Sequence, residues 1–216
     1  MLTKLLYKEF SLALHPAAVL FLLLGAMMLI PNYPMYVLFF YNTLGIFFIC
    51  LSGRENRDIA YSLSLPVKKR DVVLSRIVFA VILQLAQCAL AACFLLIRRA
   101  AGIGANGAGM DPNAAFFGLS LIMLAVFNYC FFTGYFSRPD KVGRVFARAS
   151  IATFIYICIA EACAFAVPFF RDVLDTPYPE SMGAKCVVLI IGAAIYALVT
   201  YAAYRISASR FEALDM

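Results

Sequence analysis

Long apolar runs dominate the chain, and short polar segments separate them. Each run is continuously apolar over roughly twenty residues, the length that a helix needs to cross the hydrocarbon core of a membrane. Strands of membrane barrels instead alternate apolar and polar residues. The pattern therefore predicts an all-α polytopic membrane protein with six transmembrane helices. The predicted spans cover residues 16–30, 35–52, 77–97, 114–134, 149–169 and 186–205.

The segment before the first span, residues 1–14, predicts an N-terminal interfacial amphipathic helix. At about 100° per residue, one side gathers apolar side chains and the other gathers polar ones. The apolar side holds Leu2, Leu5, Leu6, Phe10 and Leu12, and the polar side holds Lys4, Lys8 and Ser11. His15-Pro16 favours a break before the first span, although a plain extension of that span is the alternative. Glu9 falls on the apolar side, so we expect it to find a basic partner from the loops.

Composition and charge agree with a membrane protein and set its orientation. The chain is 64% hydrophobic and only 14% charged, with a mean hydropathy of +0.90. With the N-terminus inside, all but four of the 18 lysines and arginines fall on the cytoplasmic side, as the positive-inside rule requires. Both termini are therefore predicted to be cytoplasmic, in a multi-pass protein of the cell membrane. The exceptions include Arg98 and Arg99, interpreted as an interfacial pair that snorkels at the end of the third span. The net charge of +6 then reflects topology and predicts no nucleic-acid partner.

The apparent motifs for catalysis or ligand binding lack the surrounding sequence that such sites require. The glycine pattern over residues 102–107 matches G-x-G-x-x-G, but it follows a membrane span and not a strand, so it predicts a flexible external loop. That loop ends at Asp111-Pro112-Asn113, which can cap the fourth span. The seven cysteines lie almost wholly in apolar runs without a C-x-x-C pair and are interpreted as core residues. No phosphate-binding loop is present. We therefore predict no catalytic, cofactor-binding or metal-binding residues in this chain, and no enzymatic activity of its own.

The polar segment 53–76, between the second and third spans, carries the strongest functional signal. Apolar and aromatic residues stand among its charges, and such side chains on a cytoplasmic loop tend to be buried against a partner. We expect a short helix over residues 56–63 that Pro66 closes, because the residue before a proline is pushed out of the helical region. Lys68, Lys69 and Arg70 would then anchor the chain at anionic headgroups. The alternative is a basic, lipid-facing loop without a partner.

Two stretches of the chain resemble a known family. Glu55, Ser64-Leu65-Pro66-Val67, Arg70-Asp71-Val72-Val73 and Arg76 look like the first cytoplasmic loop of permeases of the ABC type-2 transporter family. Leu5-Leu6-Tyr7-Lys8-Glu9-Phe10 is similar to the N-terminal interfacial helix of that family. The six-span layout extends the resemblance over nearly the whole chain. It implies a single transmembrane permease domain over residues 1–216, with 53–76 as a cytoplasmic coupling loop.

The resemblance implies the membrane-spanning subunit of a bacterial ATP-driven exporter. Its expected partners are a separate ABC ATP-binding subunit, which binds and hydrolyses ATP, a second permease chain in a homo- or heterodimer, and membrane lipid. In this reading Pro66 ends the contact with the ATPase and Arg70 fixes its depth. The residues carried over to the coupling loop are Glu55, Arg57, Asp58, Tyr61, Leu65, Pro66 and Arg70. A third internal loop, residues 136–148, either makes a smaller contact or holds lipid phosphates.

An acidic residue inside the fifth span suggests a second site. A carboxyl group in the hydrocarbon region costs a few kcal/mol, so Glu161 is expected to face protein or water. Gln84 and Gln87 of the third span and Asn128 of the fourth are its candidate partners. Glu161 is then either a substrate-facing or gating residue or a group that holds helices together. The alternative function that it suggests is a six-span secondary transporter or solute-binding membrane subunit with Glu161 in ion coupling.

Overall fold

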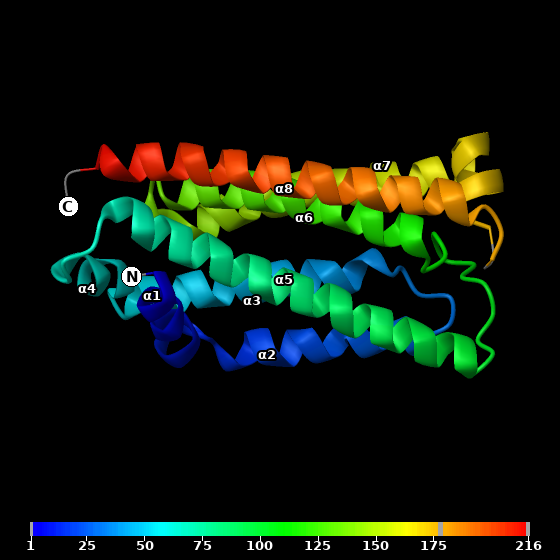
Figure 1. Cartoon of the computed structure of the whole chain (residues 1–216), viewed down its shortest axis with the longest axis horizontal. Helices are drawn as coiled ribbons and strands as arrows, with labels where there is room; N and C mark the ends of the chain where they lie inside the picture. The colour runs from blue at the N-terminus through cyan, green and yellow to red at the C-terminus, as the bar shows by residue number, and fades with distance from the viewer. Residues whose placement is uncertain (1, 177–178, 215–216) are drawn as a thin grey trace.

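The computed structural model describes residues 2–176 and 179–214, and these residues form helices without any strand (Figure 1). Residues 1, 177–178 and 215–216 of the predicted domain lie outside the described residues. The α-helices are α1 (Leu2–Lys8), α2 (Pro16–Leu23), α3 (Tyr36–Glu55), α4 (Asp58–Ser64), α5 (Lys69–Ala100), α6 (Ala114–Tyr135), α7 (Val142–Ala166) and α8 (Met182–Glu212). Shorter 3₁₀ segments cover Leu24–Leu29 and Pro139–Lys141, and π-helical turns cover Glu9–Ala13 and Phe170–Leu174. The all-α class is confirmed.

Five helical segments of the described chain are long and apolar enough to cross a membrane. They are Tyr36–Glu55, Lys69–Ala100, Ala114–Tyr135, Pro139–Ala166 and Met182–Glu212. The first predicted span, residues 16–30, corresponds to α2 and the 3₁₀ segment after it. Because a 3₁₀ helix rises about 2.0 Å per residue against about 1.5 Å for an α-helix, Pro16–Leu29 extends over about 24 Å. It passes the same test only together with Leu2–Ala13, and the two segments are bent by 89°.

The bend between these two segments lies at the predicted position. Pro16 begins α2, and the ring nitrogen Nδ1 of His15 accepts a hydrogen bond from the backbone N–H of Ala17 at 3.1 Å. The helix α1 therefore lies across the bundle and does not extend the first span, as Figure 1 shows. The predicted polar side of this segment is partly wrong, because Lys8 is buried against the bundle. Lys8 faces inward because acidic partners lie there.

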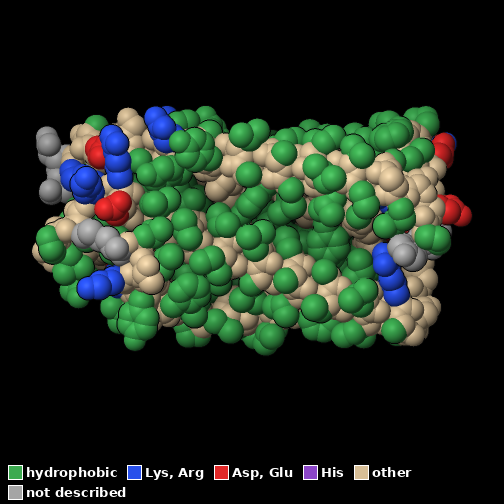
Figure 2. All heavy atoms as spheres, viewed as in Figure 1, with side chains coloured by type: hydrophobic (Ala, Val, Ile, Leu, Met, Phe, Trp, Pro, Cys, Tyr) green, Lys and Arg blue, Asp and Glu red, His purple; other side chains and the backbone are tan. Residues whose placement is uncertain are grey.

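The long helices run side by side, with charged side chains gathered at the two ends and apolar side chains between them (Figures 1 and 2). We call one end the basic end: it holds α4, the α6–α7 connection and the last turns of α8. The distal end holds the connections at residues 30–35, 101–113 and 167–176. Helices α6 and α8 approach each other closely at Gly118 and Gly192, where a Cβ added to Gly118 would lie 2.8 Å from Leu189 Cα. Small residues at helix crossings permit such close packing in membranes.

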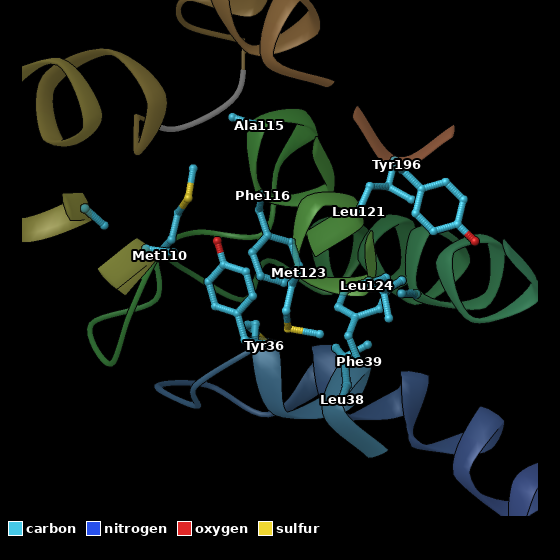
Figure 3. Packing of buried hydrophobic residues seen from close by; sticks show 14 of the residues in the cluster. Tyr36, Leu38, Phe39, Met110, Ala115, Phe116, Leu121, Met123, Leu124 and Tyr196 are labelled. Carbon is cyan, nitrogen blue, oxygen red and sulfur yellow. The ribbon is translucent and has the colours of Figure 1, made fainter. Parts of the chain in front are cut away.

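Aromatic side chains fill the interior between the helices. Tyr36 and Phe39 of α3 pack against Phe116 of α6, with ring centroids 4.9 and 5.9 Å apart (Figure 3). Met123 and Leu124 of α6 are buried in the same cluster. A second cluster toward the basic end is built around the buried phenylalanines of α6. Helix α6 is thus the central element on which the others pack.

The distal connections are tied together by hydrogen bonds. Arg98 at the end of α5 is only 3% exposed and donates to the carbonyl oxygens of Met28 at 2.8 Å, Ile30 at 3.2 Å and Gly104 at 2.7 Å. The prediction that Arg98 snorkels toward lipid headgroups is therefore wrong. Its guanidinium instead satisfies carbonyl groups that the end of the first span and the next connection leave without helical partners.

The glycine-containing connection after α5 was expected to be a flexible loop, but hydrogen bonds hold it against other segments. The side-chain amide of Asn106 donates to the carbonyl oxygen of Tyr33 at 3.0 Å, and Gly107 N donates to Asn32 Oδ1 at 2.9 Å. The predicted cap is confirmed, because Asn113 Oδ1 accepts a hydrogen bond from Phe116 N at 3.1 Å. This connection therefore joins the α2–α3 hairpin to the start of α6.

Candidate functional site

The segment after α3 turns sharply and forms a short helix at the basic end. Arg57 adopts a left-handed conformation with φ 52°, and α4 begins at the next residue. The helix ends at Ser64, and Leu65 is extended, with φ −83° and ψ 155°, before Pro66. The predicted short helix is therefore present, with its start two residues later than expected. Pro66 closes it by the expected mechanism.

Helix α4 presents two different faces. Ile59 and Leu63 pack against the second core cluster, so they hold the helix to the bundle. Tyr61 is 54% exposed, Leu65 is 37% exposed, and the adjoining Pro66 is exposed as well. Tyr61 of α4, together with Leu65 and Pro66 just after its end, thus exposes apolar surface beside a hollow that α1 also lines. Such a patch at the end of a charged segment is typical of a protein interaction site.

A buried network of charged side chains holds α4 on the side that faces the bundle. Lys8 Nζ lies 2.7 Å from Asp58 Oδ1 and donates to Ser62 Oγ at 2.7 Å. Arg76 of α5 contacts Asp58 Oδ2 through Nη2, and its Nε lies 3.0 Å from Glu9 Oε2. Glu9 is thus the acidic partner of Arg76, which confirms the expectation that it would find a basic partner from the loop region.

The network joins three segments that are far apart in the sequence. Lys8 and Glu9 belong to the helix across the basic end, Asp58 and Ser62 to α4, and Arg76 to α5. Arg76 is 4% exposed and Glu9 is completely buried. Buried charges are tolerated only when they are paired, so loss of one partner leaves the other without compensation. The three segments are therefore held in one fixed arrangement.

The predicted coupling residues divide between the two faces. Glu55, Arg57, Tyr61, Leu65 and Pro66 are exposed at the basic end, where a partner can reach them. The carboxylate of Asp58, which was predicted to belong to the same coupling loop, instead turns inward to Lys8 and Arg76. The network explains this orientation, because Asp58 is the acceptor for two basic side chains.

Arg70 also has a partner within the chain. Its Nε lies 2.6 Å from Oε1 of Glu212 at the end of α8, and this pairing raises the pKa of the Arg70 guanidinium. Lys69 Nζ donates to the carbonyl oxygen of Leu214 at 2.6 Å. Two of the three residues expected to anchor the chain at lipid headgroups, Lys69 and Arg70, thus also have partners in the C-terminal part of the chain. Arg70 ties the start of α5 to α8.

A hollow of about 460 Å³ lies beside α4. It is lined by Gly53, Arg54, Arg57, Ile59, Ala60, Leu63, Ser64, Pro139 and Asp140. Arg54 Nη1 donates to the carbonyl oxygen of Asp140 at 3.4 Å, so α4 and the α6–α7 connection form one continuous surface. Arg138, Lys141 and Arg144 are exposed on that connection and the start of α7. The surface next to α4 is therefore strongly basic.

Polar side chains within the spans form a hydrogen-bond network that does not include Glu161. Gln84 Nε2 donates to Asn128 Oδ1 at 2.7 Å, Asn128 Nδ2 donates to Thr200 Oγ1 at 3.1 Å, and Tyr196 OH donates to Gln84 Oε1 at 2.6 Å. All four side chains are buried or nearly so. They join α5, α6 and α8, which is the role of polar residues that hold helices together in membranes.

Gln87 and Glu161 each find other partners. The side-chain amide nitrogen of Gln87 faces the carbonyl oxygens of Phe21 and Leu22, at 3.3 Å each, and its side-chain oxygen accepts from Gly25 N at 3.2 Å. Gln87 therefore ties α5 to the first span. Glu161 Oε2 accepts a hydrogen bond from Met110 N at 3.1 Å in the distal connection. The expectation that Gln84, Gln87 or Asn128 would be its partner is therefore wrong. Its attachment to a distal backbone amide does not favour ion coupling.

Sequence reasoning missed Lys8, Ser62 and Arg76 as parts of the site. The available signal was the position of Glu9 on an apolar helix face, which required a buried cation. No group of three or more histidine, cysteine, aspartate or glutamate side chains within residues 2–176 and 179–214 is arranged to hold a metal ion.

Comparison with known proteins gives one match. A family model described as "ABC-2 family transporter protein" matches residues 4–212, which is nearly the whole chain. Searches among curated proteins and among solved structures found no match. The family agrees with the multi-pass helical bundle and with the resemblance in the coupling segment. The chain therefore belongs to the ABC-2 transporter family and is a membrane-spanning permease subunit of an ABC transporter.

Proposed function

We propose that this permease couples ATP hydrolysis by a separate ABC ATP-binding subunit to the export of a substrate across the cell membrane. The observation that carries the proposal is the two-faced arrangement of α4. Tyr61 and Leu65 lie exposed on its outer face, while Lys8 and Arg76 hold its Asp58 from the inner side. A helix fixed in this way is suited to receive a force and to pass it on.

The charge distribution supports an orientation with the basic end in the cytoplasm. Basic side chains crowd the α4 region, the α6–α7 connection and the end of α8, while the distal end holds Arg98, Arg99, Arg171 and Lys185. Short connections rich in lysine and arginine stay on the cytoplasmic side of membranes. In this orientation both termini are cytoplasmic, and α4 lies on the side where ATP is available.

The outer face of α4 has the composition of a docking site. Tyr61, Leu65 and Pro66 supply an apolar centre, and Glu55 and Arg57 supply a charged rim. Protein interfaces combine an apolar, aromatic centre with a polar rim in this way. The basic hollow beside α4 extends the surface toward the α6–α7 connection, and its charge is suited to an acidic patch on a partner protein. The exposed arginines there then contribute to the same contact.

The ionic network supplies a path for the motion. A displacement of α4 by the ATPase acts through Asp58 on Arg76 and Lys8, and hence on α5 and α1 together. Helix α5 extends from Lys69 to Ala100 without a break, so it can carry the motion across the membrane as a rigid element. In the proposed assembly a second permease chain completes the translocation path. In this assembly ATP is bound by the partner subunit.

Copurification tests the docking face. We expect the variant E55K/R57E/Y61A to insert normally and to lose most of the ATP-binding subunit that the unaltered chain retains. The altered residues are exposed and lie outside the buried network, so the fold should be unaffected. The matched control is R171D/D172R, which reverses an exposed ion pair at the distal end. Full retention of the ATPase by the α4 variant, or equal loss in the control, would contradict the proposal.

A further inference from the structure

A second hollow at the basic end lies between the start of α5 and the end of α8. It has a volume of about 390 Å³ and is lined by Arg70, Tyr201, Tyr204, Arg205, Ala208 and Ser209. Two guanidinium groups, two phenols and a serine hydroxyl thus surround one space. This combination of fixed positive charge and hydroxyl donors is suited to a phosphate group.

The hollow continues a face of α8 that is exposed along the helix. Val187, Ile191 and Leu198 are large apolar residues on this face, and Leu198 is 69% exposed. Tyr201 follows three residues later and Arg205 four residues after that, on the same stripe. Because an α-helix rises about 1.5 Å per residue, Arg205 lies about 10 Å beyond Leu198 along the axis. The stripe therefore changes from apolar to aromatic to cationic, in the order of acyl chain, interface and headgroup in a lipid leaflet.

Both arginines are held in place by neighbouring side chains. Arg205 Nη1 donates to Tyr201 OH at 3.2 Å, and its guanidinium carbon lies 6.0 Å from the centroid of the Tyr201 ring. Arg70 uses its Nε edge for Glu212, at 2.6 Å. A guanidinium has five N–H donors, so each arginine can make these contacts and still offer a pair of donors to an anion. Glu212 offsets one of the two positive charges, and the hollow keeps a net positive charge.

We propose that this hollow binds the phosphate headgroup of an anionic phospholipid of the cytoplasmic leaflet, with an acyl chain along the apolar stripe of α8. Arg70 and Arg205 would contact the phosphate from α5 and α8, and the lipid would bridge these two helices. The proposal uses the orientation of the basic end inferred above, but it does not require docking of an ATP-binding subunit on α4. Loss of one would leave the other unaffected.

Lipid binding to the purified full-length chain tests the proposal. Native mass spectrometry after titration with phosphatidylglycerol should show a bound lipid that phosphatidylcholine does not replace. A basic side chain near an anionic headgroup contributes about 1 kcal/mol, so R205Q should weaken phosphatidylglycerol binding about fivefold. The matched control is R148Q, which removes an exposed arginine from the basic end of α7, outside this hollow. It should leave the affinity of this bound lipid unchanged.

A second variant and a soluble competitor make the test decisive. S209E places a carboxylate at the exposed edge of the hollow and should abolish the bound lipid, a larger effect than that of R205Q, while the melting temperature stays unchanged. Glycerol phosphate, which has the headgroup chemistry without acyl chains, should compete only weakly. Equal lipid binding by R205Q and the unaltered chain, or equal binding of phosphatidylcholine, would overturn the proposal. Strong competition by glycerol phosphate would overturn the lipid as the ligand and identify a free phosphate.

Discussion

The guanidinium Nε of Arg76 lies 3.0 Å from the carboxylate oxygen Oε2 of Glu9, and both side chains are withdrawn from the surface. The same guanidinium contacts Asp58 through Nη2. One buried cation therefore connects the helix across the basic end, the short helix α4 and the long helix α5. This arrangement is the physical basis of the proposed coupling, and it makes Arg76 the residue on which the local structure depends most.

Loss of the Arg76 charge should destabilise the protein strongly. In R76M the buried carboxylate of Glu9 has only the more distant Lys8, at 3.5 Å, and a broken buried pair costs about 3–5 kcal/mol. The expected result is a clear decrease in melting temperature in detergent. The double variant E9Q/R76M removes both charges and should recover part of the loss. An R76M variant as stable as the unaltered chain would contradict a structural role for this pair.

The close crossing of α6 and α8 should not tolerate the single methyl group that G192A adds. A Cβ at Gly192 would overlap the carbonyl oxygen of Gly118 and lie 2.7 Å from its Cα, so G192A must push the two helices apart. Forced overpacking costs about 1–3 kcal/mol. Gly143 in α7 is the control, because a Cβ there would meet no atom within 4 Å, and G143A should be neutral or slightly stabilising. Thermal unfolding of both variants checks this, and equal stability would show that the crossing is looser than described.

The hydrogen bonds from Arg98 to backbone carbonyl groups predict that its substitution destabilises the distal end, by an amount similar to that expected for G192A. R98Q cannot satisfy Met28, Ile30 and Gly104 at once, and hydrogen bonds to charged groups contribute about 1.5–3 kcal/mol. We expect a lower melting temperature and faster proteolysis of the connection over residues 101–113. R171Q, which alters an exposed arginine at the same end, should have little effect. If R98Q resists protease as well as the unaltered chain does, the Arg98 hydrogen bonds do not hold this connection in place.

The pH dependence of stability should reveal the environment of Asp175, which lies between α7 and α8. Burial raises the pKa of this carboxyl group, although a hydrogen bond from Asp111 N at 2.6 Å partly opposes the shift. A carboxyl group with a raised folded-state pKa destabilises the fold as pH rises above its unfolded pKa of about 3.9. D175N keeps an oxygen acceptor for Asp111 N. It should therefore be more stable than the unaltered chain at pH 7, with no difference below about pH 3.9.

Melting temperatures of D175N and the unaltered chain, measured across this pH range, test the prediction. If D175N is less stable than the unaltered chain at pH 7, the hydrogen bond from Asp111 outweighs the desolvation, and the stated cause of the shift is wrong.

Local patterns predicted the helices well. The apolar runs located the spans, and His15-Pro16 located the bend, because chain hydropathy and proline geometry are properties of a few adjacent residues. The burial of Glu9 followed from its place on an apolar helix face. Pro66 likewise marked the end of α4. These predictions needed no knowledge of which segments meet in space.

The contradicted predictions concern side chains whose partners are distant in the sequence. Lys8 was placed on the polar side of its helix, yet Asp58 draws it inward from fifty residues away. Arg98 and Glu161 bind backbone groups of other connections, and side-chain identity gives no signal for such partners. Asp58 was recognised as part of the coupling segment, but only the fold shows that it faces inward.

The most direct test of the central claim is photo-cross-linking from the exposed face of α4. A photoreactive phenylalanine analogue replaces Tyr61 in the intact transporter, and the same analogue at Phe154, an exposed residue of α7 within the span, serves as the control. The account predicts a cross-link from position 61 to the ATP-binding subunit and none from position 154. If position 61 gives no cross-link to that subunit, or gives one no stronger than position 154, α4 is not the docking element.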